Sequence, residues 1–137
     1  MSRTLPWEVA SACEDIQCKL CITAEALEEP RLLSPEAMVQ IAVMYETTWK
    51  PDRYLHLLLL YGGEGGAAIK MKEIGYCADS LDRINSPMED ILTIKGWLLT
   101  LYLVKCVVRH GTVWMSPECK TWLSFISRHI RSRIWYT

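Results

Sequence analysis

The sequence lacks a hydrophobic stretch that is long enough to cross a membrane. Its most apolar segment is bounded by Lys95 and Lys105, whereas a spanning helix needs about 20 apolar residues. The first six residues carry no apolar region of the kind that a secretory leader has. Ser2 stands where N-myristoylation requires glycine, and the C-terminal 135–137 segment lacks the cysteine required for prenylation. We therefore expect a protein without a transmembrane segment in a reducing, intracellular compartment, the cytoplasm or the nucleus.

Residues for hydrolytic or metal chemistry are also scarce. The three histidines, His56, His110 and His129, have no metal-binding spacing, and no G-x-S-x-G nucleophile motif occurs. The acidic pair Glu89-Asp90 lies at the start of an expected helix, where the helix dipole already favours negative charge. The sequence therefore predicts no catalytic residue, no metal and no cofactor, and a protein that is not an enzyme.

The cysteines fit free thiols better than disulfides or a metal cluster. Cys13, Cys18 and Cys21 have the C-x4-C-x2-C spacing of an iron–sulfur loop, but the residues between them favour a helix, which cannot wrap a cluster. The apolar or helical surroundings are not those of a loop-rich secreted disulfide scaffold. Buried free thiols are therefore the preferred interpretation of Cys13, Cys18 and Cys21. We expect reduced and unliganded thiols at all six positions, Cys13, Cys18, Cys21, Cys77, Cys106 and Cys119.

Composition indicates one globular domain over residues 1–137. Half of the residues are hydrophobic, which is enough for a core, and the net charge of −1 gives no general attraction to nucleic acid or acidic lipid. The charge is uneven, however, because no acidic residue follows Glu118. A basic C-terminal helix could therefore bind a polyanion through Lys120, Arg128, Arg131 and Arg133.

Three serine-proline pairs predict helix starts at Ser34, Ser86 and Ser116. Serine is a favoured N-cap, and proline suits the first helical position. With the periodic apolar residues, these signals predict helices at 8–28, 35–49, 87–110 and 117–134. The expected fold is mostly α, a compact bundle of about four helices around a buried central helix at 87–110. The core residues expected on that helix are Trp97, Leu101, Tyr102 and Val104.

The segment 54–76 permits two interpretations. A short apolar run, Tyr54–Tyr61, precedes the glycine-rich stretch Gly62–Gly66, and the residues from Ala67 to Ile74 partly alternate in polarity. A β-hairpin with a glycine loop is slightly preferred. Two helical segments joined by the same loop are the alternative, because leucine favours helices.

The glycines also fit a dinucleotide-binding pattern, G-x-G-x-x-G/A, over Gly63–Ala68, with Asp79 loosely placed as the acid that would bind a ribose. Three features count against it: a helix after the glycines ends before Gly75, later parallel strands are not expected, and no Lys-Ser or Lys-Thr follows as in a P-loop. A flexible surface loop is preferred. A nucleotide-binding enzyme that uses the Gly62–Gly66 loop is retained as a distant alternative.

The tryptophans favour a binding function. Aromatic residues and arginine are enriched at protein interfaces, and the candidate interface residues are Trp7, Trp114, Trp135 and Tyr136. The leading hypothesis is a non-enzymatic helical protein that self-associates or docks on a protein partner, in the manner of a virus-encoded accessory or matrix-like protein. The alternative is a peripheral binder of RNA or an acidic membrane through the basic C-terminal helix.

Overall fold

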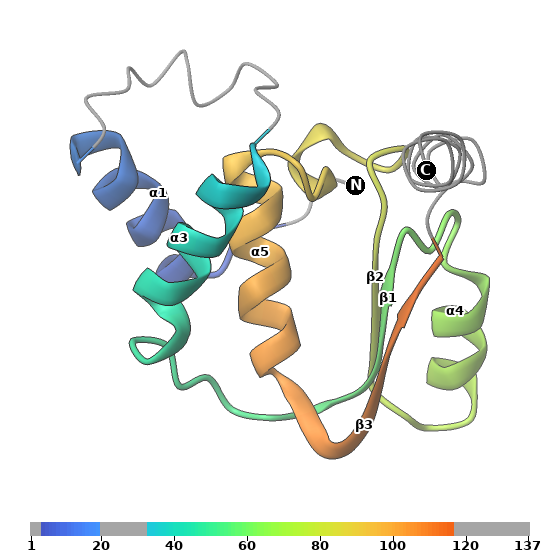
Figure 1. The fold of residues 1–137 in the computed structure, drawn as a ribbon. Coiled ribbons are helices and arrows are strands. Elements are labelled where there is room, and N and C mark those ends of the chain that lie inside the picture. The colour runs from blue at the N-terminus through green and yellow to red at the C-terminus, as the bar shows by residue number, and fades with distance from the viewer. Residues whose placement is uncertain (1–3, 20–32, 117–137) are drawn as a thin grey trace, which may run out of the picture.

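The structure is a computed structural model that describes residues 4–19 and 33–116. Within these ranges the fold is mixed α/β: three parallel strands with helices on both sides, as Figure 1 shows. The expected mostly α bundle is therefore wrong. The elements are α1 (Trp7–Lys19), α3 (Pro35–Glu46), β1 (Leu55–Leu60), α4 (Gly66–Glu73), β2 (Ala78–Leu81), the 3-10 turn η1 (Pro87–Glu89), α5 (Ile94–Lys105) and β3 (Val107–Met115).

The sheet has the order β2-β1-β3, so the first strand of the chain lies in the centre. Leu58 of β1 is opposite Asp79 of β2 and Val113 of β3, and both pairings are parallel. Parallel strands need a crossover connection, which α4 supplies between β1 and β2 and α5 supplies before β3. The carboxyl ends of all three strands therefore lie at one edge of the sheet.

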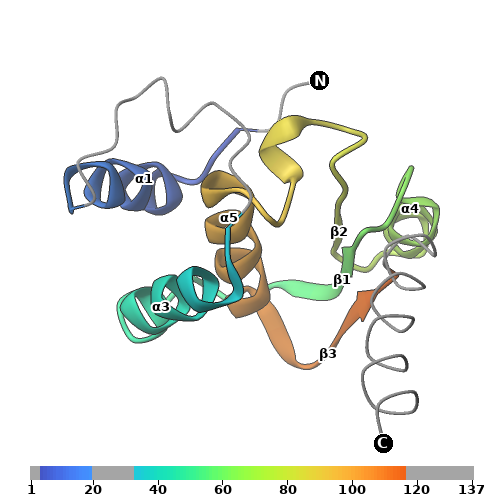
Figure 2. The ribbon, with the colours of Figure 1, turned by 45° about the horizontal axis from the view of Figure 1, so that its top comes forward.

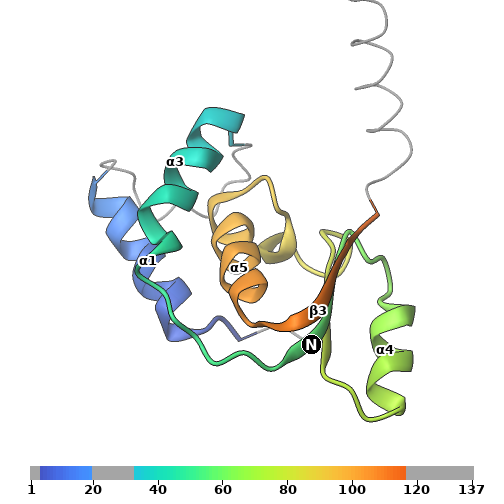
Figure 3. The ribbon, with the colours of Figure 1, turned by 60° about the horizontal axis from the view of Figure 1, so that its bottom comes forward.

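The helices form two unequal layers. Figure 3 shows α4 alone on one side of the sheet and α5 on the other side, and Figure 2 shows α1 and α3 flanking α5. Leu98 of α5 belongs to the core cluster shared with α1 and α3, whereas Leu99 and Leu103 pack in the cluster built around β1. The helix α5 therefore joins the helical layer to the sheet.

The central helix α5 is shorter than the helix expected at 87–110, and it buries a different face. Ser86-Pro87 begins only the turn η1, and α5 starts after Thr93, whose Oγ1 accepts a hydrogen bond from the Gly96 amide at 3.1 Å. Its fully buried face carries Ile94, Leu98, Leu99 and Leu103. Of the expected core residues, Trp97, Leu101 and Tyr102 are only partly buried and Val104 is exposed. An almost continuous apolar sequence does not reveal which face of a helix is buried.

The C-terminal end of the helix expected at 87–110 is also wrong, because residues 107–115 form the strand β3. Gly111 lies inside this strand. A Cβ there would stand 2.6 Å from Val107 Cγ1 and 3.1 Å from the Leu55 carbonyl oxygen, next to an irregularity in the β1–β3 register. Glycine in a strand often marks such a bulge or a close backbone approach.

Residues 54–76 form neither a hairpin nor two helices. The apolar run forms the strand β1, as the hairpin interpretation required, but the segment after the glycines is the helix α4. The strands that pair with β1 come later in the chain.

The two N-terminal helices agree better with expectation. The helix predicted at 8–28 is confirmed as α1 up to Lys19, and its remainder lies outside the described residues. The helix α3 begins at the predicted place, where Ser34 Oγ accepts a hydrogen bond from the Ala37 amide at 3.2 Å, and it ends three residues early. The predicted helix 117–134 falls outside the described part of the chain.

Burial separates the cysteines of the described ranges into two pairs. All four, Cys13, Cys18, Cys77 and Cys106, are free thiols. Cys13 is buried as expected, whereas Cys18 is exposed, so the expectation of burial is wrong for Cys18. Of the other two, Cys106 is buried and Cys77 is exposed. Burial, and to a smaller degree the carboxylate of Glu8, raises the pKa of Cys106 to about 11. Cys21 and Cys119 lie outside the described residues.

Iodoacetamide at pH 8 is expected to alkylate Cys18 and Cys77 of the folded protein and to spare Cys13 and Cys106. The buried pair is inaccessible and remains protonated, and the thiolate is the form that reacts. Peptide mapping by mass spectrometry measures the label at each position, and the denatured chain provides the fully labelled control. Labelling of Cys106 as fast as that of Cys77 would contradict the burial described above.

Gly96 is required by a close approach at the start of α5. A Cβ on this residue would lie 1.7 Å from the carbonyl oxygen of Asp90. We expect Gly96→Ala to lower the free energy of unfolding by about 1–3 kcal/mol, although alanine is preferred over glycine inside a helix by about 1 kcal/mol. Gly66→Ala is the control, since a Cβ at Gly66 meets nothing within 4 Å. Urea unfolding measures both, and an unchanged stability of Gly96→Ala would contradict this close packing.

Candidate functional site at the carboxyl edge of the sheet

The glycine loop leads directly from the central strand to a helix. Gly63 and Gly65 have φ angles of +60° and +77°, which is the left-handed region that favours glycine. The Gly65 amide donates to the Gly62 carbonyl at 3.0 Å and closes the turn. Gly65 then occupies the N-cap of α4 and has no side chain to accept from the first amides of that helix. Helix-start amides are a common binding site for an anionic group.

The positions of the glycine pattern have separate structural tasks. A Cβ at Gly62 would lie 2.2 Å from Ser80 Oγ and 2.9 Å from Leu59 Cβ, so the loop passes close to β2. Ala68, the last position of the pattern, is buried and packs with Leu59 and Ala78. In dinucleotide-binding folds the corresponding position permits the same close packing of helix and strand. The loop is therefore part of a packed βαβ unit, although Glu64 and Gly66 within it are exposed.

The acid next to the loop is Asp82. It follows the last residue of β2, whereas Asp79 lies within the strand opposite Leu58. The Asp82 Oδ2 atom accepts a hydrogen bond from the Gly63 amide at 2.8 Å, and Oδ1 accepts from the Ile84 amide at 3.0 Å. Asp79, the acid that the sequence pattern pointed to, therefore does not contact the glycine loop through a described hydrogen bond, whereas Asp82 does. In dinucleotide-binding folds the acid that binds the ribose lies after the second strand.

A second hydrogen bond fixes the same loop. The Asn85 side-chain amide donates to the Gly63 carbonyl at 3.1 Å, so both backbone groups of Gly63 bind residues that follow β2. The Asp82 amide in turn donates to Glu89 Oε1 at 3.4 Å, and Glu89 is buried. The two loops at this edge therefore hold each other in position before any ligand binds.

The carboxyl edge is rich in negative charge. Its described charged residues are Glu64, Asp82, Arg83, Glu89 and Asp90. Tyr61, directly after β1, has a φ of +59°, an unusual conformation for a bulky residue. Burial raises the pKa of Tyr61, the Asp90 carboxylate raises it further, and Arg83 acts in the opposite direction. The tyrosine hydroxyl therefore remains protonated and available as a hydrogen-bond donor near neutral pH.

Two features of the sequence counted against a nucleotide-binding site at the glycine loop, namely the short following helix and the lack of later parallel strands. The helix α4 is short, as expected, but it serves as the crossover between β1 and β2. Later parallel strands are present, because β3 pairs with β1 in parallel. In open parallel sheets, ligands bind outside the carboxyl ends of the strands.

The interface and polyanion-binding residues predicted from the sequence are not brought together at the carboxyl edge of the sheet. Trp7 at the start of α1 and Trp114 on β3 are exposed by 74% and 60%, and they belong to different layers of the fold. The other two interface candidates, Trp135 and Tyr136, lie outside the described residues. The same is true of the whole polyanion-binding set, Lys120, Arg128, Arg131 and Arg133.

Searches for other features and for similar proteins give negative results. Over residues 4–19 and 33–116, no group of three or more histidine, cysteine, aspartate or glutamate side chains is placed to hold a metal ion. No helix of this part has the length and apolar character that a membrane span needs. Comparison of the chain with protein-family models, curated proteins and solved structures finds no match.

Proposed function

We propose that this protein binds an adenosine-containing cofactor at the carboxyl edge of its sheet, and that the cofactor is of the S-adenosylmethionine type. The observation that carries the proposal is the pair formed by the Gly62–Gly66 loop and Asp82, which meet through the 2.8 Å hydrogen bond to Gly63. This arrangement supports the nucleotide-binding alternative over the non-enzymatic docking hypothesis. The reaction class that such a cofactor serves is methyl transfer.

Asp82 is suited to the ribose. A carboxylate offers about four lone-pair positions, and the backbone amides of Gly63 and Ile84 occupy one on each oxygen. Positions remain to accept hydrogen bonds from two vicinal ribose hydroxyls, as the acid after the second strand does in dinucleotide-binding folds. The amide contacts hold the carboxylate in place before binding, which lowers the entropic cost of association.

The charge of the edge selects among adenosine cofactors. Among the described residues of this edge, the four carboxylates of Glu64, Asp82, Glu89 and Asp90 outnumber one cation, Arg83, and they would repel a pyrophosphate. S-adenosylmethionine has no phosphate and carries a sulfonium and an ammonium group, which these carboxylates attract. Its one carboxylate fits the amides at the start of α4, where Gly65 leaves the helix N-terminus without a side-chain cap.

Docking on a protein partner or self-association stays a prediction. The exposed side chains at the end of β3, Val113, Trp114 and Met115, support it, and light scattering after size-exclusion chromatography measures it. Binding of RNA or acidic lipid likewise stays a prediction, which depends on residues beyond 116.

Cofactor binding is expected to raise the stability of the folded chain. At a ligand concentration 100 times the dissociation constant, the gain is about 2.7 kcal/mol. Thermal unfolding with S-adenosylmethionine, S-adenosylhomocysteine and NAD+ at equal concentrations, followed by calorimetric titration, measures it. We expect the first two ligands to bind and NAD+ to bind at least tenfold more weakly. Stabilisation by NAD+ alone would overturn the cofactor class, and no binding at millimolar concentrations would overturn the proposed function.

Substitution of the two aspartates tests the site itself. Asp82→Asn is expected to weaken binding of S-adenosylhomocysteine about tenfold, because charge-assisted hydrogen bonds to the ribose are lost. Asp79→Asn, three residues earlier and within β2, is the matched control and should leave the affinity unchanged. If Asp82→Asn does not fold, as judged by circular dichroism, substitution of the exposed Glu64 gives the second test. Glu64→Gln should weaken the binding of S-adenosylmethionine and strengthen the binding of NAD+. Equal affinities for both aspartate variants would contradict the role of Asp82.

A further inference from the structure

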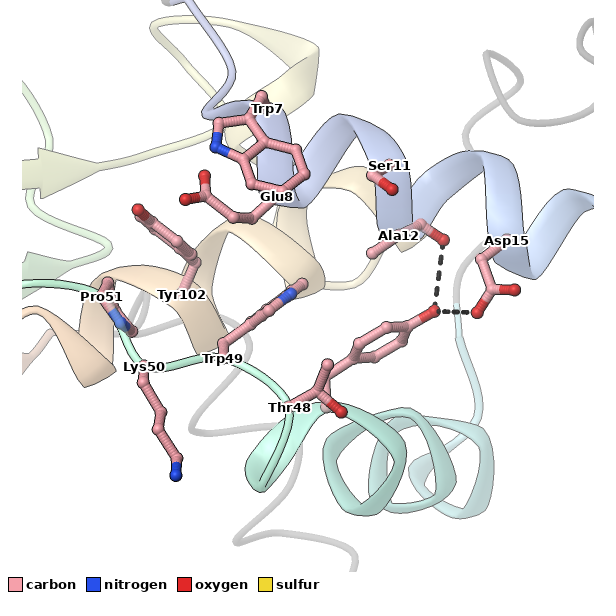
Figure 4. Close-up of a pocket in the computed structure, with 11 residues that line it drawn as sticks. Trp7, Glu8, Ser11, Ala12, Asp15, Thr48, Trp49, Lys50, Pro51 and Tyr102 are labelled. Carbon is pink, nitrogen blue, oxygen red and sulfur yellow. Dashed lines mark hydrogen bonds between the residues drawn. The ribbon is translucent and has the colours of Figure 1, made fainter.

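A second candidate site lies in the helical layer, away from the glycine loop. A cavity of about 440 Å³ opens between α1, the C-terminal end of α3 and the segment that follows it, and it reaches Tyr102 of α5. None of the residues of the carboxyl edge lines it. Figure 4 shows the cavity with its aromatic rings and carboxylates.

Aromatic rings form one wall of this cavity. The rings of Tyr45 and Trp49 are stacked with their centroids 4.9 Å apart, and the ring of Tyr102 meets Trp49 edge-on at 5.7 Å. Trp7, exposed by 74%, stands at the opposite side of the cavity (Figure 4). Aromatic faces carry negative electrostatic potential and attract cations within about 6 Å of the ring centre.

The wall is held rigidly. Lys105 donates hydrogen bonds to the carbonyl groups of Glu46 and Trp49, the second at 2.8 Å, and thereby fixes the segment that carries Trp49. The Tyr45 hydroxyl donates to Asp15 Oδ2 at 2.9 Å and is 3.3 Å from the Ala12 carbonyl oxygen. Trp49 is 6% exposed, so the core holds its ring in place, whereas the exposed Trp7 is not held in this way.

One face of α1 supplies negative charge. Glu8, Ser11 and Asp15 lie one and two helical turns apart and line the cavity together. Burial, followed by the nearby carboxylate of Glu8, raises the pKa of Tyr102, and burial together with Asp15 raises that of Tyr45. Among the described lining residues, Lys50 is the one with a cationic side chain, and in Figure 4 that side chain extends away from the aromatic rings.

We propose that this cavity binds an alkylated ammonium group between Trp7, Trp49 and Tyr102, with Glu8 as its counter-charge. Aromatic rings combined with carboxylates are the environment in which quaternary ammonium groups are recognised. A phosphate or a carboxylate would be repelled by Glu8 and Asp15. The group can belong to a small amine or to a methylated lysine side chain, since the chemistry recognised is the same. This proposal does not depend on the cofactor site.

The decisive experiment compares two ligands of equal shape. Choline carries a quaternary nitrogen, and 3,3-dimethyl-1-butanol replaces that nitrogen by carbon and is neutral. Calorimetric titration of the full chain is expected to show choline binding at least tenfold more tightly than the neutral analogue. A peptide that contains trimethyllysine, compared with its unmodified lysine form, then distinguishes a peptide-borne cation from a free amine. Equal binding of choline and the neutral analogue, or no binding of either cation, would overturn the proposal.

Variants at the exposed part of the cavity identify the binding groups without disturbing the core. Trp7→Ala and Glu8→Gln are each expected to weaken binding of the cation at least fivefold, and Trp7→Phe to retain part of it. Glu14→Gln removes the same charge from an exposed position of α1 that does not line the cavity, and Trp114→Ala removes an exposed tryptophan from β3. Both controls should bind normally. If Glu14→Gln weakens binding as much as Glu8→Gln, the effect is one of general charge and the assigned site is wrong.

Discussion

The packing of α5 between two core clusters is the constraint on which the rest of the structure depends. Leu98 contributes to the cluster with α1 and α3, and Leu99 and Leu103 contribute to the cluster with β1. The Trp97 indole nitrogen donates to the Met38 carbonyl at 2.9 Å, which links the same helix to α3. A rotation of α5 about its own axis would disturb the aromatic cavity and the sheet together, because the cavity lies on one side of this helix and the sheet on the other.

The two candidate sites use different parts of this framework. The carboxyl edge is built from backbone groups and loop carboxylates, and its geometry depends on the close approach at Gly62 and on the left-handed conformation of Gly63 and Gly65. The aromatic cavity is built from large side chains that the core holds in place. A cofactor at the sheet edge and a cation in the helical layer would therefore occupy separate surfaces of one small fold, each with its own excess of negative charge.

Local signals in the sequence identified some elements and failed at specific positions. Ser34-Pro35 marked the start of α3, and the run LHLLLL was assigned to a strand, because capping and β-rich runs are local properties. Residues 67–74 alternate partly but form a helix, since the buried Ala68 must pack on β1. The boundary between α5 and β3 was missed because the apolar sequence continues through it. The contact of Asp82 with the glycine loop was not predicted, because it depends on where β2 ends, and only the sheet pairing defines that end.

The position of β1 has a consequence for how the chain folds. The central and most apolar strand precedes both of its neighbours in the sequence, so during synthesis it emerges before either partner exists. Its pairing with β3 closes a long segment that contains α4, β2 and α5, and such non-local pairing slows folding. Until then an unpaired apolar strand is exposed to intermolecular association. The helix α4 follows β1 directly in the chain and packs on it through Ala68 and Leu59, so it is the first element that can cover residues 55–60.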